Sequence, residues 1–527
     1  MIRIAVIVFI GALAISFGVS ALTVSPWLWL VAVLCAGIAG LGTYDLLQKR
    51  HSVLRNYPVL GHIRFMLESI RPELQQYFIE RNTDGRPYDR DVRSLVYQRA
   101  KGTEAEIAFG TERNVYAEGY EYFESSMRPR PVPAEQPRVR IGGPDCTKPY
   151  DMALLNVSAM SFGSLSSNAI LALNQGAALG GFAHDTGEGG MSEYHLRHGG
   201  DLVWEIGTAY FGCRTPDGGF DRARFAEKAA RDNVKCVSLK LSQGAKPGIG
   251  GVLPGEKVTA EIARVREVPE GQTVISPPYH QVFDTPRELI RFIAEIRELS
   301  GGKPVGFKLC VGSRREFLAV CKAMLEEGTA PDFIIVDGAE GGTGAAPLEF
   351  ADHLGSPLTE GLITVHNALV GVGLRDRVKI GASGKVATGA DIVKRMLQGA
   401  DFTNAARAMM FAIGCIQAQS CHTNTCPAGV ATQDPRRARA LDVDDKSARV
   451  HRFQSATVNS ALQIIASLGV SEPAELRPSM LRRRVDPVTV RSYAELYDWL
   501  TPGQLLIEPP ESWAVDWKAA DPDRFAV

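Results

Sequence analysis

The fold is decided by the stretch PVGFKLCVGSRREFLAVCKAMLEEGTAPDFIIVD (residues 304–337). Two short apolar runs, at 304–310 and 332–337, flank a segment at 315–327 whose apolar residues recur at helical spacing. Continuous apolar runs are typical of parallel strands that are buried on both faces, whereas strands of a half-exposed sheet alternate. The stretch therefore predicts a strand, a helix and a second parallel strand.

The same alternation of apolar runs and amphipathic segments recurs through residues 150–470. The apolar runs are LLNVSAM (154–160), GFAHD (181–185), WEIGTAYF (204–211), KCVSLKL (235–241), PVGFKLC (304–310), DFIIVD (332–337), RVKIGAS (377–383) and DFTNAAR (401–407). Amphipathic segments such as PRELIRFIAEIREL (286–299) and ADIVKRMLQG (390–399) lie between them. Eight strands that alternate with helices predict an α/β fold, a (β/α)8 barrel of TIM type. An open, doubly wound sheet is the alternative that the pattern leaves open.

Polar, glycine-rich segments follow the predicted strands. They are SFGS (161–164), TGEGG (186–190), SQGAKPGIGG (242–251), GAEGGTGAAP (338–347) and GASGKVATG (381–389). Each alone reads as an ordinary turn, but a barrel gathers all of them at the carboxyl ends of its strands, where catalytic sites lie. The last two loops of a barrel commonly bind a phosphate group through backbone N–H groups. A phosphorylated cofactor such as FMN fits this pattern.

The balanced charge and the absence of two nucleotide-binding motifs exclude some classes of function. The 58 Lys and Arg residues balance 59 Asp and Glu residues, so no basic excess exists to neutralise nucleic-acid phosphates. No G-x-G-x-x-G follows a strand of a βαβ unit and no P-loop motif occurs. If a reduced nicotinamide is the electron donor, we expect another subunit to bind it.

Two apolar runs, Ile4–Val24 and Trp27–Leu46, open the chain, and each is close to the ~20 residues that cross a bilayer. A signal peptide cleaved near Val19-Ser20-Ala21 is one interpretation. The second run favours a retained transmembrane hairpin over residues 1–47. Basic residues after it indicate an inner (cytoplasmic) membrane protein whose catalytic domain faces the cytoplasm; they are Lys49, Arg50, His51 and Arg55.

Between the hairpin and the barrel we expect a helical collar and linker over residues 48–149. It has helical patterning at 63–81 and an extended, proline-rich segment at 127–137. The barrel domain is predicted over 150–470, and a C-terminal extension over 471–527.

Three of the nine cysteines, Cys415, Cys421 and Cys426, lie close together in the chain. A four-iron cubane takes four thiolates, so three of them favour a [3Fe–4S] cluster, and Pro427 fits the Cys-Pro of ferredoxin sites. A zinc site completed by His422 and a set of buried structural cysteines are the alternatives.

The chain resembles the synthase domain of glutamate synthase. The resemblance rests on CHTN (421–424), CPAGVATQ (426–433), SAMSFGSLS (158–166), TGEGG (186–190), KLSQGAKPG (240–248), LPGEKV (253–258), ISPP (275–278) and GGTGAAP (341–347), which occur in family order over about 150–470. With its hairpin and collar, the chain is similar to stand-alone FMN-binding glutamate synthase-like proteins.

The resemblance implies a barrel that binds FMN beside a [3Fe–4S] cluster, and reduction of the imine of 2-oxoglutarate and ammonia to L-glutamate. Glu188 is then expected to orient the iminium or move its proton, and Lys246 and Arg266 to bind the dicarboxylate. Because ARVR (263–266) is an ordinary helical run, a solvated helix charge is the alternative for Arg266. The residues expected around FMN are Ser158, Ala159, Met160, Lys240, Gln243, Lys308, Gly342, Gly344, Gly381, Ser383, Gly384 and Arg407.

The chain departs from the family in its substrate loop. It reads KPGIGGVLPGEKV (246–258) where the large enzymes usually read KPGEGGQLPGEKV, so Ile249 and Val252 replace a carboxylate and an amide. Ala339 and Glu340 stand where His-Asp is common. An FMN oxidoreductase acting on another 2-oxo acid or amine is therefore an alternative, as is a non-catalytic membrane redox carrier or sensor.

The partners follow from the same comparison. The first cysteine, Cys35, lies inside the apolar hairpin, so we expect no glutaminase domain before the barrel. Ammonia is then free or comes from an amidotransferase subunit. Electrons are expected from a separate donor, either ferredoxin or an NAD(P)H-dependent reductase subunit.

Overall fold

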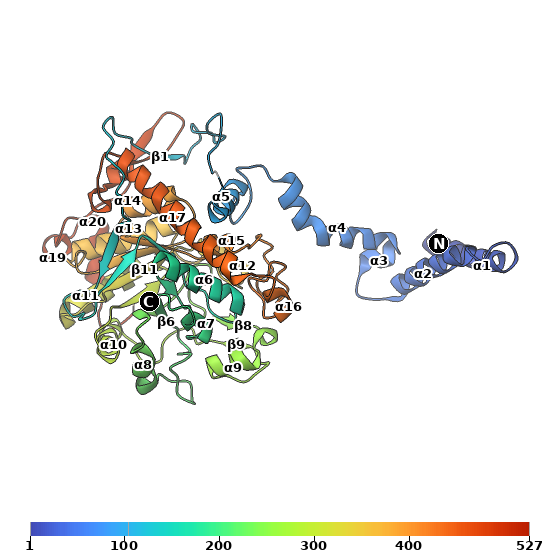
Figure 1. The fold of residues 1–527 in the computed structure, drawn as a ribbon, viewed down its shortest axis with the longest axis horizontal. Helices are drawn as coiled ribbons and strands as arrows, with labels where there is room; N and C mark the ends of the chain where they lie inside the picture. The colour runs from blue at the N-terminus through green and yellow to red at the C-terminus, as the bar shows by residue number, and fades with distance from the viewer. Residues whose placement is uncertain (1, 104, 526–527) are drawn as a thin grey trace. The chain divides into compact units, whose positions relative to one another are not determined.

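The computed structural model describes residues 2–103 and 105–525. The chain divides into two compact units, one that ends at Pro87 and one that begins at Tyr88 (Figure 1). The first residue of the predicted hairpin and the last two of the predicted extension lie outside the described residues.

Eight parallel strands close into a barrel in the second unit, which confirms the predicted fold class and excludes the open sheet. The strands are β4 (Leu155–Val157), β5 (His184–Asp185), β6 (Leu202–Ile206), β7 (Val234–Lys240), β10 (Val305–Leu309), β11 (Phe333–Asp337), β12 (Lys379–Ser383) and β13 (Phe402–Ala405). Each overlaps one predicted apolar run. The last strand pairs with the first, with Thr403 opposite Leu155, so the barrel has no open edge.

Helices surround the barrel (Figure 1). They include α6 (Ser167–Gly180), α7 (Glu193–Leu196), α8 (Arg222–Ala229), α9 (Ala260–Arg266), α10 (Pro286–Leu299), α11 (Arg314–Glu327), α12 (Leu348–His353), α13 (Leu358–Gly371), α14 (Gly389–Leu397), α15 (Arg407–Ala412), α16 (Pro435–Ala438) and α17 (Val443–Ser467). Local signals set their ends. The Ser313 side chain caps α11 by accepting from the Glu316 N–H, and Gly328 ends this helix at φ 67°, which favours glycine.

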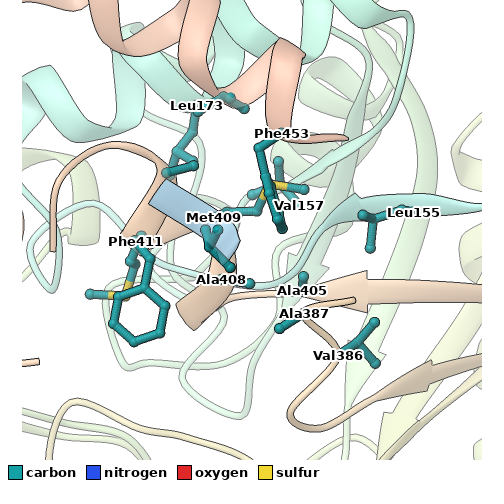
Figure 2. Close-up of a cluster of buried hydrophobic side chains, with 14 of the residues drawn as sticks. Leu155, Val157, Leu173, Val386, Ala387, Ala405, Ala408, Met409, Phe411 and Phe453 are labelled. Carbon is teal, nitrogen blue, oxygen red and sulfur yellow. The ribbon is translucent and has the colours of Figure 1, made fainter. Parts of the chain in front are cut away.

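The core between the barrel and its helices is apolar and closely packed. Figure 2 shows one part of it, where β4, β13 and α15 meet α17. Val157 lies beside Met409 and Phe453, Leu155 lies farther along the same strand, and all four side chains are buried. This packing fixes the first and last strands, and therefore the loops that follow them.

Segments that precede and follow the barrel in the sequence also belong to the second unit. Helix α5 (Arg90–Lys101) contacts α17, and β2 (Arg138–Ile141) pairs with β3 (Tyr150–Ala153). Further elements of this unit are β1 (Glu121–Phe123), β14 (Leu481–Arg484), β15 (Val490–Ser492), α18 (Tyr493–Leu496), α19 (Gln504–Ile507) and α20 (Glu511–Ala519). Strand β1 pairs with β14, which joins the predicted collar to the predicted C-terminal extension. The structure thus divides the 48–149 collar at Pro87, while the predicted domain boundaries stay predictions.

The first unit begins with two apolar helices, α1 (Ile2–Thr23) and α2 (Leu28–Leu47), which contact each other. They are followed by α3 (Ser52–Asn56), α4 (Leu60–Leu74) and a π-helical turn η1 (Gln75–Ile79), as the pattern at 63–81 predicts. Asp45 in α2 is fully buried. Its carboxylate accepts from the Val59 N–H at 2.9 Å and lies 2.9 Å from Nε2 of His62. This carboxylate therefore ties the end of α2 to the start of α4.

Replacing Phe453 with alanine should destabilise the barrel unit by about 3–5 kcal/mol, because the substitution leaves a cavity in the core of Figure 2. Thermal denaturation followed by circular dichroism measures this. Val515→Ala, at a side chain that is 77% exposed, is the control and should leave the unfolding temperature unchanged. Equal effects of the two substitutions would contradict the packing described.

Candidate active site

The structure places most of the predicted site residues at or just beyond the carboxyl ends of the barrel strands. Ser158, Ala159 and Met160 follow β4, Glu188 follows β5, and Lys240 ends β7. The other predicted residues on these loops or strand ends are Gln243, Lys246, Lys308, Gly342, Gly344, Ser383, Gly384 and Arg407. Gly381 lies instead in the middle of β12, where an added Cβ would overlap Phe402, and Arg266 ends α9. Because the strands are parallel and closed, the residues on the loops and strand ends face one mouth of the barrel.

An ion pair between Glu188 and Lys240 lies at the centre of this mouth, with Oε1 3.0 Å from Nζ. Burial raises the pKa of Glu188, but Lys240, Arg266 and Lys246 outweigh burial, so the pKa lies below its usual value and Glu188 is a carboxylate. Gly251 packs against this carboxylate so closely that an added Cβ would overlap Oε1. The glycine of the substrate loop is therefore needed where the loop passes the ion pair.

Arg266 is buried, with 5% of its surface exposed, so the interpretation as a solvated helix charge is wrong. Helix α9 directs its guanidinium inward, where Nη2 donates to Ser161 Oγ at 3.2 Å and to Phe162 O at 3.1 Å. The guanidinium also lies 5.1 Å above the Phe211 ring. Its Nε–H has no partner among the described residues. The unsatisfied donor leaves Arg266 one hydrogen bond to give to a ligand.

Lys246 is 4% exposed. Burial, followed by the charge of Lys240, lowers the pKa of Lys246, and Glu188 opposes this shift. Among the described residues, no hydrogen bond or ion pair is formed by the Lys246 ammonium. Together, Lys240, Lys246 and Arg266 place three cations against the one carboxylate of Glu188. A mouth with two uncompensated positive charges favours a ligand that carries two negative charges.

A second charged tier lies inside the barrel. Lys308 Nζ lies 2.6 Å from Glu205 Oε2, and both residues are buried, so Lys308 pairs with a carboxylate on β6. Asp185 lies beside them, accepts from the Gly187 N–H at 2.9 Å through Oδ1, and has no partner for Oδ2 within the described chain. Sequence reasoning missed Asp185 and Glu205. The signal was a charged residue inside an otherwise apolar strand run.

Several residues that are expected around FMN gather from four strand ends. Ser158 Oγ lies 3.4 Å from Ser383 Oγ, which joins the ends of β4 and β12. Arg407 begins α15, donates to Glu340 O at 2.9 Å and lies 5.0 Å from the Tyr88 ring. A Cβ at Gly342 would overlap this guanidinium. Two hydroxyls and a guanidinium near glycine backbone are suitable donors for a phosphate group.

A cavity of about 420 Å³ beside β10 is distinct from this mouth. Phe307 and Leu309 line it, whereas Lys308 between them points into the barrel. Since side chains alternate along a strand, the cavity lies outside the barrel wall, between β10 and α11. None of the predicted site residues lines it.

The three predicted cluster cysteines lie in an irregular segment between α15 and α16. Cys426 is buried, while Cys415 and Cys421 are partly buried and pack against the same apolar core. Burial raises the pKa of the Cys421 thiol, and the nearby Cys426 sulfur raises it further; Cys415 lies within electrostatic range of both. Tyr97 holds the segment by donating to Cys415 O at 2.7 Å.

Within residues 2–103 and 105–525, no three His, Cys, Asp or Glu side chains are grouped tightly enough to hold a single metal ion. His422 is exposed, so the described structure gives no support to a zinc site of three cysteines and this histidine. The three cysteines belong to or pack against the same apolar core cluster, and each of them lies within electrostatic range of the other two. The iron–sulfur cluster stays a prediction.

Comparison with known proteins decides the family. Residues 138–471 match the family described as "Conserved region in glutamate synthase". The chain is also 38% identical over 470 residues to the "glutamate synthase large subunit-like protein YerD" of Bacillus subtilis, across 81% of this chain and 89% of the relative. The chain belongs to the glutamate synthase family. Family membership makes it an oxidoreductase of the glutamate synthase type and confirms the resemblance stated above.

Other relatives match over a smaller share of the chain. An archaeal glutamate synthase (NADPH) of Methanocaldococcus jannaschii is 33% identical over 330 residues, which are 62% of this chain and 61% of the relative. A solved structure of flavocytochrome b2 with pyruvate bound covers 87% of this chain and 95% of its own at 15% identity, with a TM-score of 0.41. That structural likeness is too slight to bear on function.

The buried Asp185 gives this family member a pH-dependent stability. Burial, followed by the charge of Glu205, raises the pKa of Asp185 to about 8, whereas an unfolded aspartate titrates near ~4. The folded state holds the proton more tightly, so its contribution to stability is complete below about pH 4 and is lost as the pH rises toward 8. Asp185→Asn, which cannot ionise, should therefore lose less stability than the wild type between about pH 5 and 8.

Thermal denaturation across this pH range measures the difference. Asp232→Asn, at an exposed position after α8, is the control and should follow the wild-type curve. Parallel curves for Asp185→Asn and the wild type would show that Asp185 is ionised throughout.

Proposed function

We propose that this protein is a membrane-tethered glutamate synthase-type oxidoreductase that carries FMN and a [3Fe–4S] cluster and reductively aminates 2-oxoglutarate, through 2-iminoglutarate, to L-glutamate. The observation that carries the proposal is the cluster of Glu188, Lys240, Lys246 and Arg266 at the barrel mouth. Its two uncompensated positive charges match a dicarboxylate, in a chain of the glutamate synthase family.

Bound FMN would supply the hydride that reduces the imine. The residues of the chain bind and orient the substrate for that step. Arg266, with its free Nε–H, and Lys246, with its free ammonium, are placed to bind the two carboxylates. Glu188 is ionised beside Lys240, so its carboxylate can hold an iminium N–H or receive its proton. Lys240 keeps that carboxylate in position.

FMN is supported by donors at the same mouth. Ser383, Gly384 and Arg407 offer hydroxyl, backbone and guanidinium groups to its phosphate. Lys240 and Gln243 lie at the end of β7, where they can hydrogen-bond the electron-rich edge of the flavin. Lys308 forms an ion pair with Glu205, so we propose that it would act on bound FMN through its charge and not by direct contact.

The hairpin supports membrane tethering. Helices α1 and α2 are each long and apolar enough to cross a bilayer. A Cβ at Gly42 would contact Ile7 of α1, and buried Asp45 binds Val59 and His62 beyond α2. Since the close approach of Gly42 and Ile7 packs α1 against α2, it favours a retained hairpin over a cleaved signal peptide. The basic residues after α2 favour a cytoplasmic catalytic unit.

The test uses the full-length protein purified from membranes in detergent. We expect an FMN absorbance spectrum and formation of glutamate from 2-oxoglutarate and ammonium with reduced ferredoxin or a reduced dye. Co-purification identifies a reductase or amidotransferase subunit. Protein that contains FMN but makes no glutamate would contradict the named reaction and leave the barrel unaffected.

Arg266→Met should raise the KM for 2-oxoglutarate by about ten- to a hundredfold, because a charged hydrogen-bond donor to the substrate is lost. Steady-state kinetics, with FMN content measured for each variant, gives this value. Arg264→Met on the same helix is the matched control, since Arg264 is exposed. An unchanged KM in Arg266→Met would remove Arg266 from the substrate site.

Val252 favours a second candidate, an FMN oxidoreductase of the same fold for another 2-oxo acid. Its side chain is 42% exposed on the hairpin of β8 (Val252–Leu253) and β9 (Val274–Ile275), opposite Ile275, which is 72% exposed. The family resemblance implies an amide at position 252 that helps to hold 2-oxoglutarate. An apolar pair there suits a substrate with a less polar distal end.

Val252→Gln distinguishes the candidates. In a glutamate synthase whose binding is weakened at this position, the new amide should raise kcat/KM for 2-oxoglutarate by about tenfold, the effect of one hydrogen bond of ~1.4 kcal/mol. Wild-type preference for an apolar 2-oxo acid, lost in Val252→Gln, would instead establish the second candidate. Gly312→Ala, at a glycine whose Cβ would meet open space, is the control.

A further inference from the structure

Lys257 is a buried cation that the proposed chemistry does not use. It ends the short 3-10 turn η2 (Gly255–Lys257), in the motif LPGEKV, and is 2% exposed. Its Nζ donates to three main-chain carbonyls, Ser164 O at 3.1 Å, Cys421 O at 2.8 Å and Ala431 O at 3.2 Å. Three acceptors require three N–H groups, and only the protonated amine has them. Lys257 is therefore held as a buried ammonium.

The three acceptors belong to separate parts of the proposed site. Ser164 lies on the loop after β4, which also contacts Arg266 through Ser161 and Phe162. Cys421 and Ala431 lie on the cysteine segment. Lys257 itself lies in the substrate loop, a few residues beyond Val252. One side chain thus joins the substrate loop, the first barrel loop and the cysteine segment.

The ammonium also lies near Cys421. Nζ lies 2.8 Å from the main-chain oxygen of Cys421, so its positive charge is held beside this predicted cluster ligand. Within the described chain, no carboxylate forms an ion pair with Lys257 that would cancel its charge.

We propose that Lys257 is the positioning and charge-setting residue of the cysteine segment: its ammonium holds the Cys421 main chain against the barrel loop and raises the reduction potential of the group that the three cysteines bind. This inference rests on the proposed [3Fe–4S] cluster. A fixed positive charge stabilises the reduced, more negative state of a cluster, and net local charge is one of the factors that sets the potential of such groups. Lys257 therefore favours entry of one electron from the external donor.

The test compares Lys257→Met, which removes the charge, with Lys257→Arg, which keeps it. Lys303→Met is the matched control, because Lys303 is also buried and donates to two main-chain carbonyls, of Ala229 and Arg231, away from the cysteines. Full-length proteins in detergent are assayed for FMN, iron and sulfide. Each is then titrated with dithionite through mediators, and one-electron reduction of the cluster is followed by electron paramagnetic resonance.

We expect Lys257→Met to lower the ratio of reduced to oxidised cluster at a fixed potential by about tenfold or more, which for a one-electron couple is ~59 mV. Lys257→Arg should stay within threefold of the wild type, and Lys303→Met should match the wild type in potential while losing thermal stability. FMN content should be unchanged in all three. Electron paramagnetic resonance reports the effect independently of turnover.

Two results overturn the inference. The first is a wild-type potential in Lys257→Met; the second is loss of FMN and of the folded barrel in both Lys257 variants, which would make Lys257 a general core residue. A third result would contradict the proposed function and can be distinguished from these two. Wild-type protein that contains FMN but no iron or sulfide contradicts the proposed cluster itself, and with it any role of Lys257 toward that cluster.

Discussion

The pairing of β13 with β4 is the constraint on which the rest of the catalytic unit depends. Thr403 donates to Leu154 O from its backbone N–H at 2.9 Å and from its hydroxyl at 2.6 Å, across 249 residues of sequence. Because this pairing closes the sheet, every strand has two neighbours and every strand-end loop converges on one mouth. The loops carry the chemistry, but their convergence comes from the closed ring and from the core that packs β4 and β13 against α17.

The charge arrangement at that mouth is costly for folding and useful for binding. Lys240, Lys246 and Arg266 are buried like charges, and burial lowers the pKa of Lys246 and brings that of Arg266 to about 10. Glu188 compensates for one of them. Of the two remaining cations, Arg266 is held at the mouth by hydrogen bonds to the first barrel loop and by the Phe211 ring. A dianionic ligand would neutralise the two positive charges that Glu188 leaves uncompensated. Relief of the repulsion between these cations would then contribute to the binding free energy.

Much of the fold was predictable from local pattern, because eight apolar runs between amphipathic segments have few other packings. For the site, the sequence predicted which strand ends carry its residues, but not which side chains contact one another. Arg266 lies in an ordinary helical run, and its burial depends on Ser161, Phe162 and Phe211 from two other loops. The three acceptors of Lys257 come from segments up to 174 residues away, so no local signal marks it. Lys308 could be placed at a strand end, but its ion pair with Glu205 depends on the registers of β6 with β7 and of β7 with β10.

The substrate loop and the segment after it contain two kinds of side chain, buried cations and exposed apolar residues. Lys246 lies in the loop before β8, and Arg266 lies on α9, in the connection between β8 and β9; both are buried. Arg266 is oriented by hydrogen bonds to Ser161 and Phe162, and not by the strand residues of β8 and β9. Val252 and Ile275 instead lie opposite each other on the exposed part of this hairpin. If the proposed function holds, the buried cations recognise the carboxylates, while the exposed side chains of β8 and β9 are free to differ and set the selectivity for the rest of the molecule. On that proposal, the departure at positions 249 and 252 bears on which 2-oxo acid enters, and the charge cluster bears on its carboxylates.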